Sequence, residues 1–319
     1  MNNNPVVLYG PTARHILSLG ETIPVDFQRF PGGESYCQIR ENIRGRDVFA
    51  LQSICAPAND SLMDLLVLGD AARRASAGRL TAVIPYMGYM RQDRKDKPRV
   101  PISAKLVVDM LECAGFQRII TIDVHTLQAQ GFTNVPFDHL FGFPLLTRAI
   151  TRAVPDSPLV FLSPDIGGVK RIQAYAGAFG ADFAIVNKKR LDANSVQACS
   201  IIGDVDGLDV VVVDDLTESC NTLISAATIA RQHGAKSVSA VVTHACLHQR
   251  GLANLRQAFD NGTINFFITT NTVHSPGLEQ LMGEGHPVVI EDCSQFLWDV
   301  INRTSEGRSL TELFDLEGF

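Results

Sequence analysis

Several common devices are missing from this sequence of 319 residues. It contains neither a GxxxxGK[ST] phosphate-binding loop nor a GxGxxG dinucleotide fingerprint, so any nucleotide must be held by other means. Its seven cysteines are scattered without CxxC spacing, which gives no zinc site and suits a reducing compartment. No apolar run approaches the length of a membrane span, and the start MNNNPVV lacks the regions of a signal peptide.

The sequence also has fewer basic residues than acidic ones, with 28 Lys and Arg against 34 Asp and Glu. Its formal net charge of −6 argues against a general nucleic-acid binder, although basic residues cluster locally. A hydrophobic content of 45% is typical of a globular protein with a large core, and 319 residues are enough for two domains. The composition therefore predicts a cytoplasmic enzyme with no nucleic-acid or membrane partner.

Strand-like apolar runs alternate with helical patterns along the chain, which predicts an α/β fold with mostly parallel sheets flanked by helices. The predicted strands are Val6–Tyr9, Val48–Gln52, Leu80–Pro85, Ile119–Asp123, Leu159–Ser163, Phe183–Val186, Val210–Asp214, Val238–Thr243, Ile264–Thr269 and Val288–Ile290. The predicted helices include Ser61–Ala77, Ser103–Cys113, Gly167–Phe179, Asn221–His233 and Gly251–Phe259. Residues Arg29 to Ile39 predict a hairpin or flap. The best domain boundary lies near Phe143–Pro158.

The stretch VVVVDDLTESCNT, residues 210–222, carries the most information. A buried strand runs into Asp214 and Asp215, at the strand end where open α/β sheets bind ligands. Paired acids can accept hydrogen bonds from two vicinal hydroxyls. The turn that follows offers hydroxyls and backbone N–H groups at a helix N-terminus, which suits a phosphate. The stretch therefore predicts a sugar-phosphate site; the alternative is that Asp215 and Ser219 only cap a helix.

Two basic segments could contact a polyphosphate. Residues 86–101, YMGYMRQDRKDKPRVP, form a loop that is bounded by Gly88 and prolines, although a charge run is often only a solvated surface. Lys188 and Arg190 follow a strand and alternate, so they would project to the same side of an extended segment. They could stabilise charge on transferred phosphoryl oxygens, or they could form an ordinary basic hairpin tip.

Candidate metal groups follow two other predicted strands. Asp123 and His125 come after RIITI, and Asp165 comes after LVFLS. Mg²⁺ favours carboxylate oxygens, water and substrate phosphates, so His125 would by its chemistry more often be a hydrogen-bonded structural residue. Gly167 and Gly168 permit a close approach of the backbone to a ligand.

In this order the segments resemble the ribose-phosphate pyrophosphokinase (PRPP synthetase) family over almost the whole chain. The matching segments are RFPGGE, ENIRGRDV, LMDLLVLGDAARRASAGRLTAVIPYMGYMRQDRKDKPRVPISAKLV, TIDVHTLQAQGF, SPDIGGVKR, ADFAIVNKKR, IIGDV, VVDDLTESCNT, VVTHA and GRSLTELF. The resemblance implies two phosphoribosyltransferase-type domains, residues 1–147 with the ATP flap and loop and residues 148–319 with the ribose 5-phosphate loop. It also implies Mg²⁺-dependent transfer of the β,γ-diphosphoryl group of ATP to ribose 5-phosphate, and a homo-oligomer, a hexamer built from dimers.

The resemblance assigns roles residue by residue. The predicted catalytic pair is Lys188 and Arg190, and the predicted metal ligands are His125 and Asp165. The predicted ATP-binding residues are Phe30, Glu34, Arg91, Gln92 and Asp93. The predicted ribose 5-phosphate site consists of Asp214, Asp215, Glu218, Ser219, Cys220, Asn221 and Thr222.

Departures from the family pattern include Gly32, Ile166 and Asn221, the conservative changes to Glu218 and Ser219, and the segment LYGPTARHI. Asn221 stands where the family commonly has glycine, so we expect an αL-like residue there, with weakened affinity for ribose 5-phosphate that Asn221→Gly improves. These departures indicate a divergent paralogue. The alternatives are a non-catalytic regulatory paralogue and a PRPP-consuming phosphoribosyltransferase, although the RQDRKD loop argues against the latter.

Overall fold

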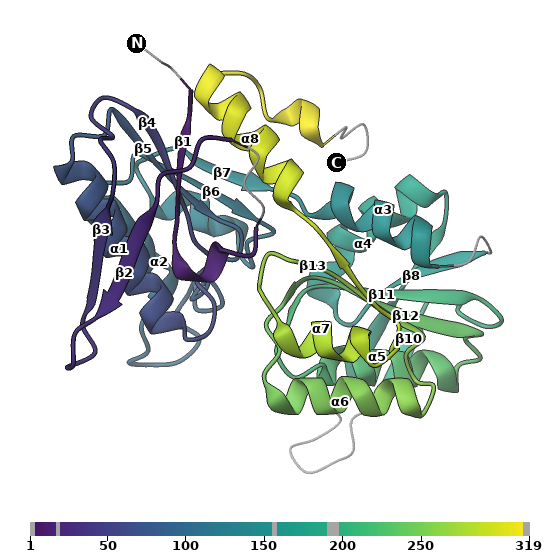
Figure 1. Cartoon of the computed structure of the whole chain (residues 1–319). Coiled ribbons are helices and arrows are strands. Elements are labelled where there is room, and N and C mark those ends of the chain that lie inside the picture. Colours follow the sequence, from purple (N-terminus) through teal and green to yellow (C-terminus); the bar gives the residue numbers. More distant parts are fainter. Residues whose placement is uncertain (1–3, 17–19, 155–157, 190–197, 315–319) are drawn as a thin grey trace. The chain divides into compact units, whose positions relative to one another are not determined.

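The computed structural model describes residues 4–16, 20–154, 158–189 and 198–314. It divides the chain into two compact units, each built on its own sheet (Figure 1). The first unit comprises Met1–Gly142, Thr272–His274 and Asp292–Phe314. The second comprises Phe143–Asn271 and Ser275–Glu291. Two mostly parallel sheets with flanking helices confirm the predicted α/β fold class.

The first unit contains a five-stranded parallel sheet in the order β1-β4-β5-β6-β7. Its strands are β1 (Val6–Tyr9), β4 (Asp47–Leu51), β5 (Arg79–Ile84), β6 (Arg118–Ile122) and β7 (Phe137–Leu140). The unit also contains α1 (Ala58–Arg74), α2 (Ser103–Ala114), α8 (Ser294–Glu306) and the short 3-10 helices η1 (Pro11–Ala13), η2 (Leu127–Phe132) and η4 (Thr311–Leu313). A separate antiparallel hairpin of β2 (Val25–Arg29) and β3 (Ser35–Ile39) confirms the predicted hairpin, which begins at Val25 rather than Arg29.

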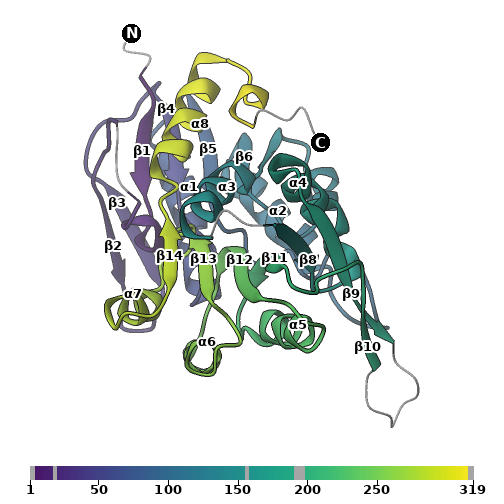
Figure 2. The ribbon, with the colours of Figure 1, turned by 90° about the vertical axis from the view of Figure 1, so that its right-hand side faces the viewer.

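Helices α1 and α2 cover the first sheet because their apolar residues recur at helical spacing. In α1 the buried positions Leu62, Leu65 and Leu68 lie on one face, and they pack into the same core as Val107 and Leu111 of α2. The helix α8 comes from the end of the chain and returns beside this sheet (Figures 1 and 2).

The second unit contains a seven-stranded sheet in the order β10-β9-β8-β11-β12-β13-β14. Its strands are β8 (Leu159–Ser163), β9 (Asp182–Lys189), β10 (Ala198–Ile202), β11 (Asp209–Thr217), β12 (Ser237–Ala245), β13 (Phe266–Thr270) and β14 (Val288–Glu291). Its helices are η3 (Ile166–Gly168), α3 (Phe143–Ala153), α4 (Val169–Phe179), α5 (Asn221–Gln232), α6 (Gln249–Asp260) and α7 (Pro276–Gly283). Neighbouring strands are parallel except for the β9–β10 pair.

The helices of the second unit cover both faces of its sheet. Helices α3 and α4 pack on one face, and α5, α6 and α7 pack on the other (Figures 1 and 2). The central strand β11 is therefore buried on both sides, which explains its uninterrupted run from Val210 to Val213. Within the described part of the chain, every helix is too short or too polar to cross a bilayer.

Candidate functional site

The acid pair lies at the carboxyl end of β11 in the second unit. Strand β8 pairs with β11 only as far as Leu162 opposite Val212, so Asp214 and Asp215 extend past the end of β8. On the other side β12 pairs with β11 as far as Thr217. The strand therefore continues to Thr217 rather than ending at Asp214 as predicted, and both carboxylates are held on a rigid strand.

The two carboxylates are largely enclosed and share one cation. The Asp214 side chain is 21% exposed and the Asp215 side chain is 6% exposed. Nη1 of Arg171, on α4, lies 3.3 Å from Oδ1 of Asp214 and 3.7 Å from Oδ1 of Asp215. Burial, together with the charge of Asp215, raises the pKa of Asp214 to about 7, and Arg171 opposes this rise. The acid pair is thus an acceptor site whose negative charge Arg171 offsets only in part.

The turn after β11 leads into α5 and is held by its own hydrogen bonds. The Cys220 N–H donates to Oγ1 of Thr217 at 3.1 Å, and the Asn221 N–H donates to Oγ of Ser219 at 3.4 Å. Asn254, on α6, donates to the Ser219 carbonyl at 2.9 Å and holds this turn in place. A twelve-residue helix that begins here directs its partial positive end toward the turn, which suits an anionic ligand.

The expected geometry at Asn221 is wrong. The left-handed residue is Cys220, with φ of 59°, whereas Asn221 is the first residue of α5. The Asn221 side chain is exposed, and its Oδ1 accepts a hydrogen bond from Nδ2 of Asn254 at 3.0 Å. The Cys220 side chain is buried, and burial raises the pKa of its thiol to about 12. The sulfur therefore adds no negative charge beside an anion.

Asp165 lies in the turn that joins β8 to α4. Its Oδ1 accepts a hydrogen bond from the Gly168 N–H at 3.2 Å, and its carbonyl accepts one from Oγ of Ser163 at 2.6 Å. Gly168 is required because a Cβ there would lie 2.5 Å from that hydroxyl. Since β8 and β11 are neighbours, this turn and the acid pair lie at the same edge of the sheet.

The predicted ATP flap is the tip of the β2–β3 hairpin in the first unit. The Phe30 N–H donates to the Glu34 carbonyl at 3.0 Å, and the Phe30 ring is 50% exposed. The hairpin is anchored next to its tip, where Nη2 of Arg29, the last residue of β2, donates to Oδ2 of Asp64 on α1 at 2.9 Å. An anchored hairpin with an exposed aromatic at its tip can contact a planar base.

The predicted nucleotide loop follows β5 and is tied to the loop after β6. Oδ2 of Asp93 accepts a hydrogen bond from Oγ1 of Thr126 at 2.8 Å. Gln92 folds the loop onto itself, because its Nε2 donates to the Arg94 carbonyl at 2.8 Å. Arg91 and His125 are both exposed at this edge of the sheet. The structure therefore brings the predicted loop and His125 to neighbouring strand ends within one unit.

The predicted metal ligands belong to different units, His125 to the first and Asp165 to the second. Among the described residues, no three His, Cys, Asp or Glu side chains form a metal-binding group. The exposed carboxylate of Asp165 fits the oxygen preference of Mg²⁺, and the imidazole of His125 suits it less. Their joint role as metal ligands stays a prediction.

The predicted catalytic pair is only partly described. The backbone of Lys188 lies in β9 and pairs with Cys199 of β10. Arg190 lies outside the described residues. Their predicted roles stay predictions.

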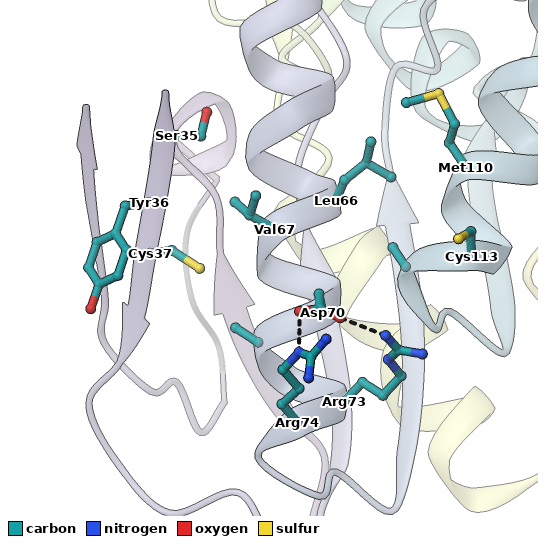
Figure 3. A pocket seen from close by; sticks show the side chains of 12 residues that line it. Ser35, Tyr36, Cys37, Leu66, Val67, Asp70, Arg73, Arg74, Met110 and Cys113 are labelled. Carbon is teal, nitrogen blue, oxygen red and sulfur yellow. Dashed lines mark hydrogen bonds and ion pairs between the residues drawn. The ribbon is translucent and has the colours of Figure 1, made fainter. Parts of the chain in front are cut away.

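A separate cavity of about 590 Å³ lies beside α1 in the first unit (Figure 3). Its walls come from β3, α1 and α2, and they include Tyr36, Cys37, Leu66 and Met110. Both Arg73 and Arg74 at its edge pair with Asp70. Its described lining includes none of the predicted site residues.

Two residues of the second-unit site were missed from the sequence. Arg171 is the cation of the acid pair, and Asn254 holds the turn before α5. Arg171 is the last residue of SPDIGGVKR and lies in the first turn of the helix after Asp165, the candidate metal ligand. This position next to a candidate site could have identified it from the sequence. Asn254 carried no signal because its partner Ser219 is distant in sequence.

Comparison with known proteins covers both units. Residues 16–115 match the N-terminal domain of ribose phosphate pyrophosphokinase, and residues 184–315 match the phosphoribosyl synthetase-associated domain. The chain is 43% identical over 316 residues to a ribose-phosphate pyrophosphokinase of Vibrio parahaemolyticus, covering 98% of this chain and 97% of that one. It is 45% identical over 288 residues to the protein of that name from Shewanella oneidensis, covering 90% and 89%. The crystal structure of phosphoribosylpyrophosphate synthetase from Mycobacterium smegmatis matches with a TM-score of 0.84 and 31% identity, over 95% of this chain and 99% of that one.

Proposed function

The chain belongs to the ribose-phosphate pyrophosphokinase family, and we propose that it transfers the β,γ-diphosphoryl group of ATP to the 1-hydroxyl of ribose 5-phosphate, giving PRPP and AMP for nucleotide biosynthesis. One observation of the structure carries this proposal. The enclosed acid pair and the turn at the N-terminus of α5 follow each other on β11, so acceptors for sugar hydroxyls stand beside donors for a phosphate.

In the proposed complex, Asp214 and Asp215 accept hydrogen bonds from two ribose hydroxyls. Residues 218–222 bind the 5-phosphate through backbone N–H groups and the hydroxyls of Ser219 and Thr222. Glu218 is exposed at the start of this turn, and its carboxylate side chain adds no donor to the backbone N–H groups. This arrangement fixes the sugar at both ends, which leaves its 1-hydroxyl as the group to be aimed at ATP.

The nucleotide is proposed to bind to the first unit. Phe30 and Glu34 contact it from the flap, and Arg91, Gln92 and Asp93 contact it from the loop after β5. An exposed Arg91 guanidinium suits a phosphate group, and the exposed Phe30 ring suits a base. The functional division at residues 1–147 and 148–319 belongs to this proposal.

Phosphoryl transfer depends mainly on positioning and charge stabilisation. Lys188 and Arg190 are proposed to stabilise charge on the transferred phosphoryl oxygens as the AMP oxygen departs. Asp165 and His125 are each proposed as a ligand for Mg²⁺, which when bound would neutralise charge on the phosphates. We also propose a cytoplasmic location and a homo-oligomer, a hexamer built from dimers, because the family resemblance implies both.

An assay for AMP release tests the proposal. The protein is incubated with ATP and Mg²⁺, with and without ribose 5-phosphate. AMP formation that requires ribose 5-phosphate is the expected result. A protein that binds ribose 5-phosphate but releases no AMP would instead be a regulatory paralogue, and the proposed activity would be refuted.

A further inference from the structure

Arg171 lies within salt-bridge distance of both carboxylates of the acid pair. Its Nη1 lies 3.3 Å from Asp214 and 3.7 Å from Asp215, so a single guanidinium nitrogen faces both carboxylates. The Arg171 side chain is 29% exposed, which places this contact at the rim of the sheet rather than in free solvent. Such charge-assisted contacts are stronger and more directional than those between neutral groups.

The position of Arg171 is set by the turn that precedes α4. Asp165 accepts the Gly168 N–H, and this bond fixes the start of α4 two residues before Arg171. A Cβ on Gly168 would lie 2.5 Å from Oγ of Ser163, so that hydroxyl, which bonds the Asp165 carbonyl, would have to move; Nη1 of Arg171 would lie at an ordinary contact distance of 3.9 Å. The turn that contains Asp165, the proposed metal ligand, therefore also determines where the Arg171 guanidinium lies relative to Asp214 and Asp215.

Two adjacent, enclosed carboxylates repel each other unless a cation lies between them. Without Arg171 they would separate or one would keep its proton, and a protonated carboxyl accepts fewer hydrogen bonds from a sugar hydroxyl. We propose that Arg171 is a positioning residue for ribose 5-phosphate: its guanidinium holds Asp214 and Asp215 together as acceptors for two ribose hydroxyls. This inference rests on the proposed function, because it assumes that the acid pair binds the sugar.

The chain offers a matched control at the other end of β11. Nζ of Lys236 lies 3.2 Å from Oδ2 of Asp209, whose side chain is 3% exposed. Lys236→Met therefore also removes a cation from an enclosed aspartate on the same strand, but far from the strand end that carries the acid pair. A general loss of strand stability would appear in both variants, whereas a loss of sugar positioning would appear only in Arg171→Met.

The experiment measures steady-state constants and the direct binding of ribose 5-phosphate by calorimetry. In Arg171→Met, the KM and the Kd for ribose 5-phosphate should both rise about 10- to 100-fold, the range for loss of a hydrogen bond to a charged group. The KM for ATP should be unchanged and kcat should fall less than about 3-fold, because the contact is present before the reaction begins. Arg171→Lys should recover much of the ribose 5-phosphate affinity lost in Arg171→Met, since lysine restores the positive charge although it lacks the planar guanidinium. Lys236→Met should bind ribose 5-phosphate normally.

A double-mutant cycle with Asp214→Asn tests whether Arg171 acts through the acids. Removing Arg171 in the Asp214→Asn background should cost much less affinity than removing it from the wild-type protein. Fully additive effects, or an unchanged Kd in a folded Arg171→Met variant, would overturn the inference while leaving the proposed function intact. A wild-type protein that forms no AMP from ATP and ribose 5-phosphate would instead refute the proposed function.

Discussion

Replacing Asp214 with asparagine should change how the stability of the second unit depends on pH. In the folded protein, burial and the adjacent Asp215 raise the pKa of Asp214 to about 7 from an ordinary value of 3.8. The folded state therefore binds a proton more tightly than the unfolded state does. The stability from this group is fully present below the ordinary pKa and is lost as the pH rises through about 7.

The magnitude follows from the size of the shift. The difference between 3.8 and about 7 corresponds to roughly 4 kcal/mol at about 1.4 kcal/mol per pKa unit. Asparagine is neutral throughout and its Oδ1 can still accept the Asp215 N–H, which donates to Asp214 at 2.9 Å. The variant should therefore match the wild-type protein near pH 4 and exceed its stability increasingly up to about pH 8, by at most about 4 kcal/mol.

Hydrogen exchange of peptides from β11 is a suitable assay because it reports on the second unit alone. The variant and the wild-type protein are compared at each pH, so that the pH dependence of the intrinsic exchange rate cancels. Asp182→Asn, an exposed carboxylate of the same unit, serves as the control. A stability difference that stays constant across this pH range, or that falls as the pH rises, would refute the electrostatic reasoning.

Three further substitutions test separate parts of the proposed site. Lys188→Ala should lower kcat about 10²–10³-fold with little change in ribose 5-phosphate affinity, and near-normal turnover in steady-state assays would contradict its role. Asn221→Gly should weaken ribose 5-phosphate binding several-fold in calorimetry, because it removes the acceptor of the Asn254 hydrogen bond, whereas tighter binding would restore the αL explanation. Arg29→Met should raise the KM for ATP several-fold and leave that for ribose 5-phosphate unchanged, because it releases the flap from Asp64; equal effects on both substrates would argue against a nucleotide flap.

Much of the fold was predictable because the sheets are parallel and buried. Strands β1 and β8 have the predicted bounds, and the flap hairpin has the predicted place. Strand β7 was missed because FDHL is short and half polar, so it has no continuous apolar run. The return of α8 to the first unit was also missed, since local patterns carry no information about which distant segment a helix packs against.

The candidate site was predictable in residue type but less so in geometry. The acid pair could be found from its position after a valine run, yet the continuation of β11 to Thr217 depends on pairing with β12. The left-handed position was assigned to Asn221 from glycine preferences, whereas the left-handed residue in the structure is Cys220, directly before α5. Arg171 and Asn254 act on the site across the fold, so their roles needed the structure.

The central claim is diphosphoryl transfer, and the products formed from γ-labelled ATP test it most directly. The protein is incubated with labelled ATP, ribose 5-phosphate and Mg²⁺, and the products are separated and quantified. The account predicts AMP and labelled PRPP in equal amounts, because both terminal phosphates move together. Formation of ADP with a labelled ribose bisphosphate, or AMP formation that does not depend on ribose 5-phosphate, would contradict it.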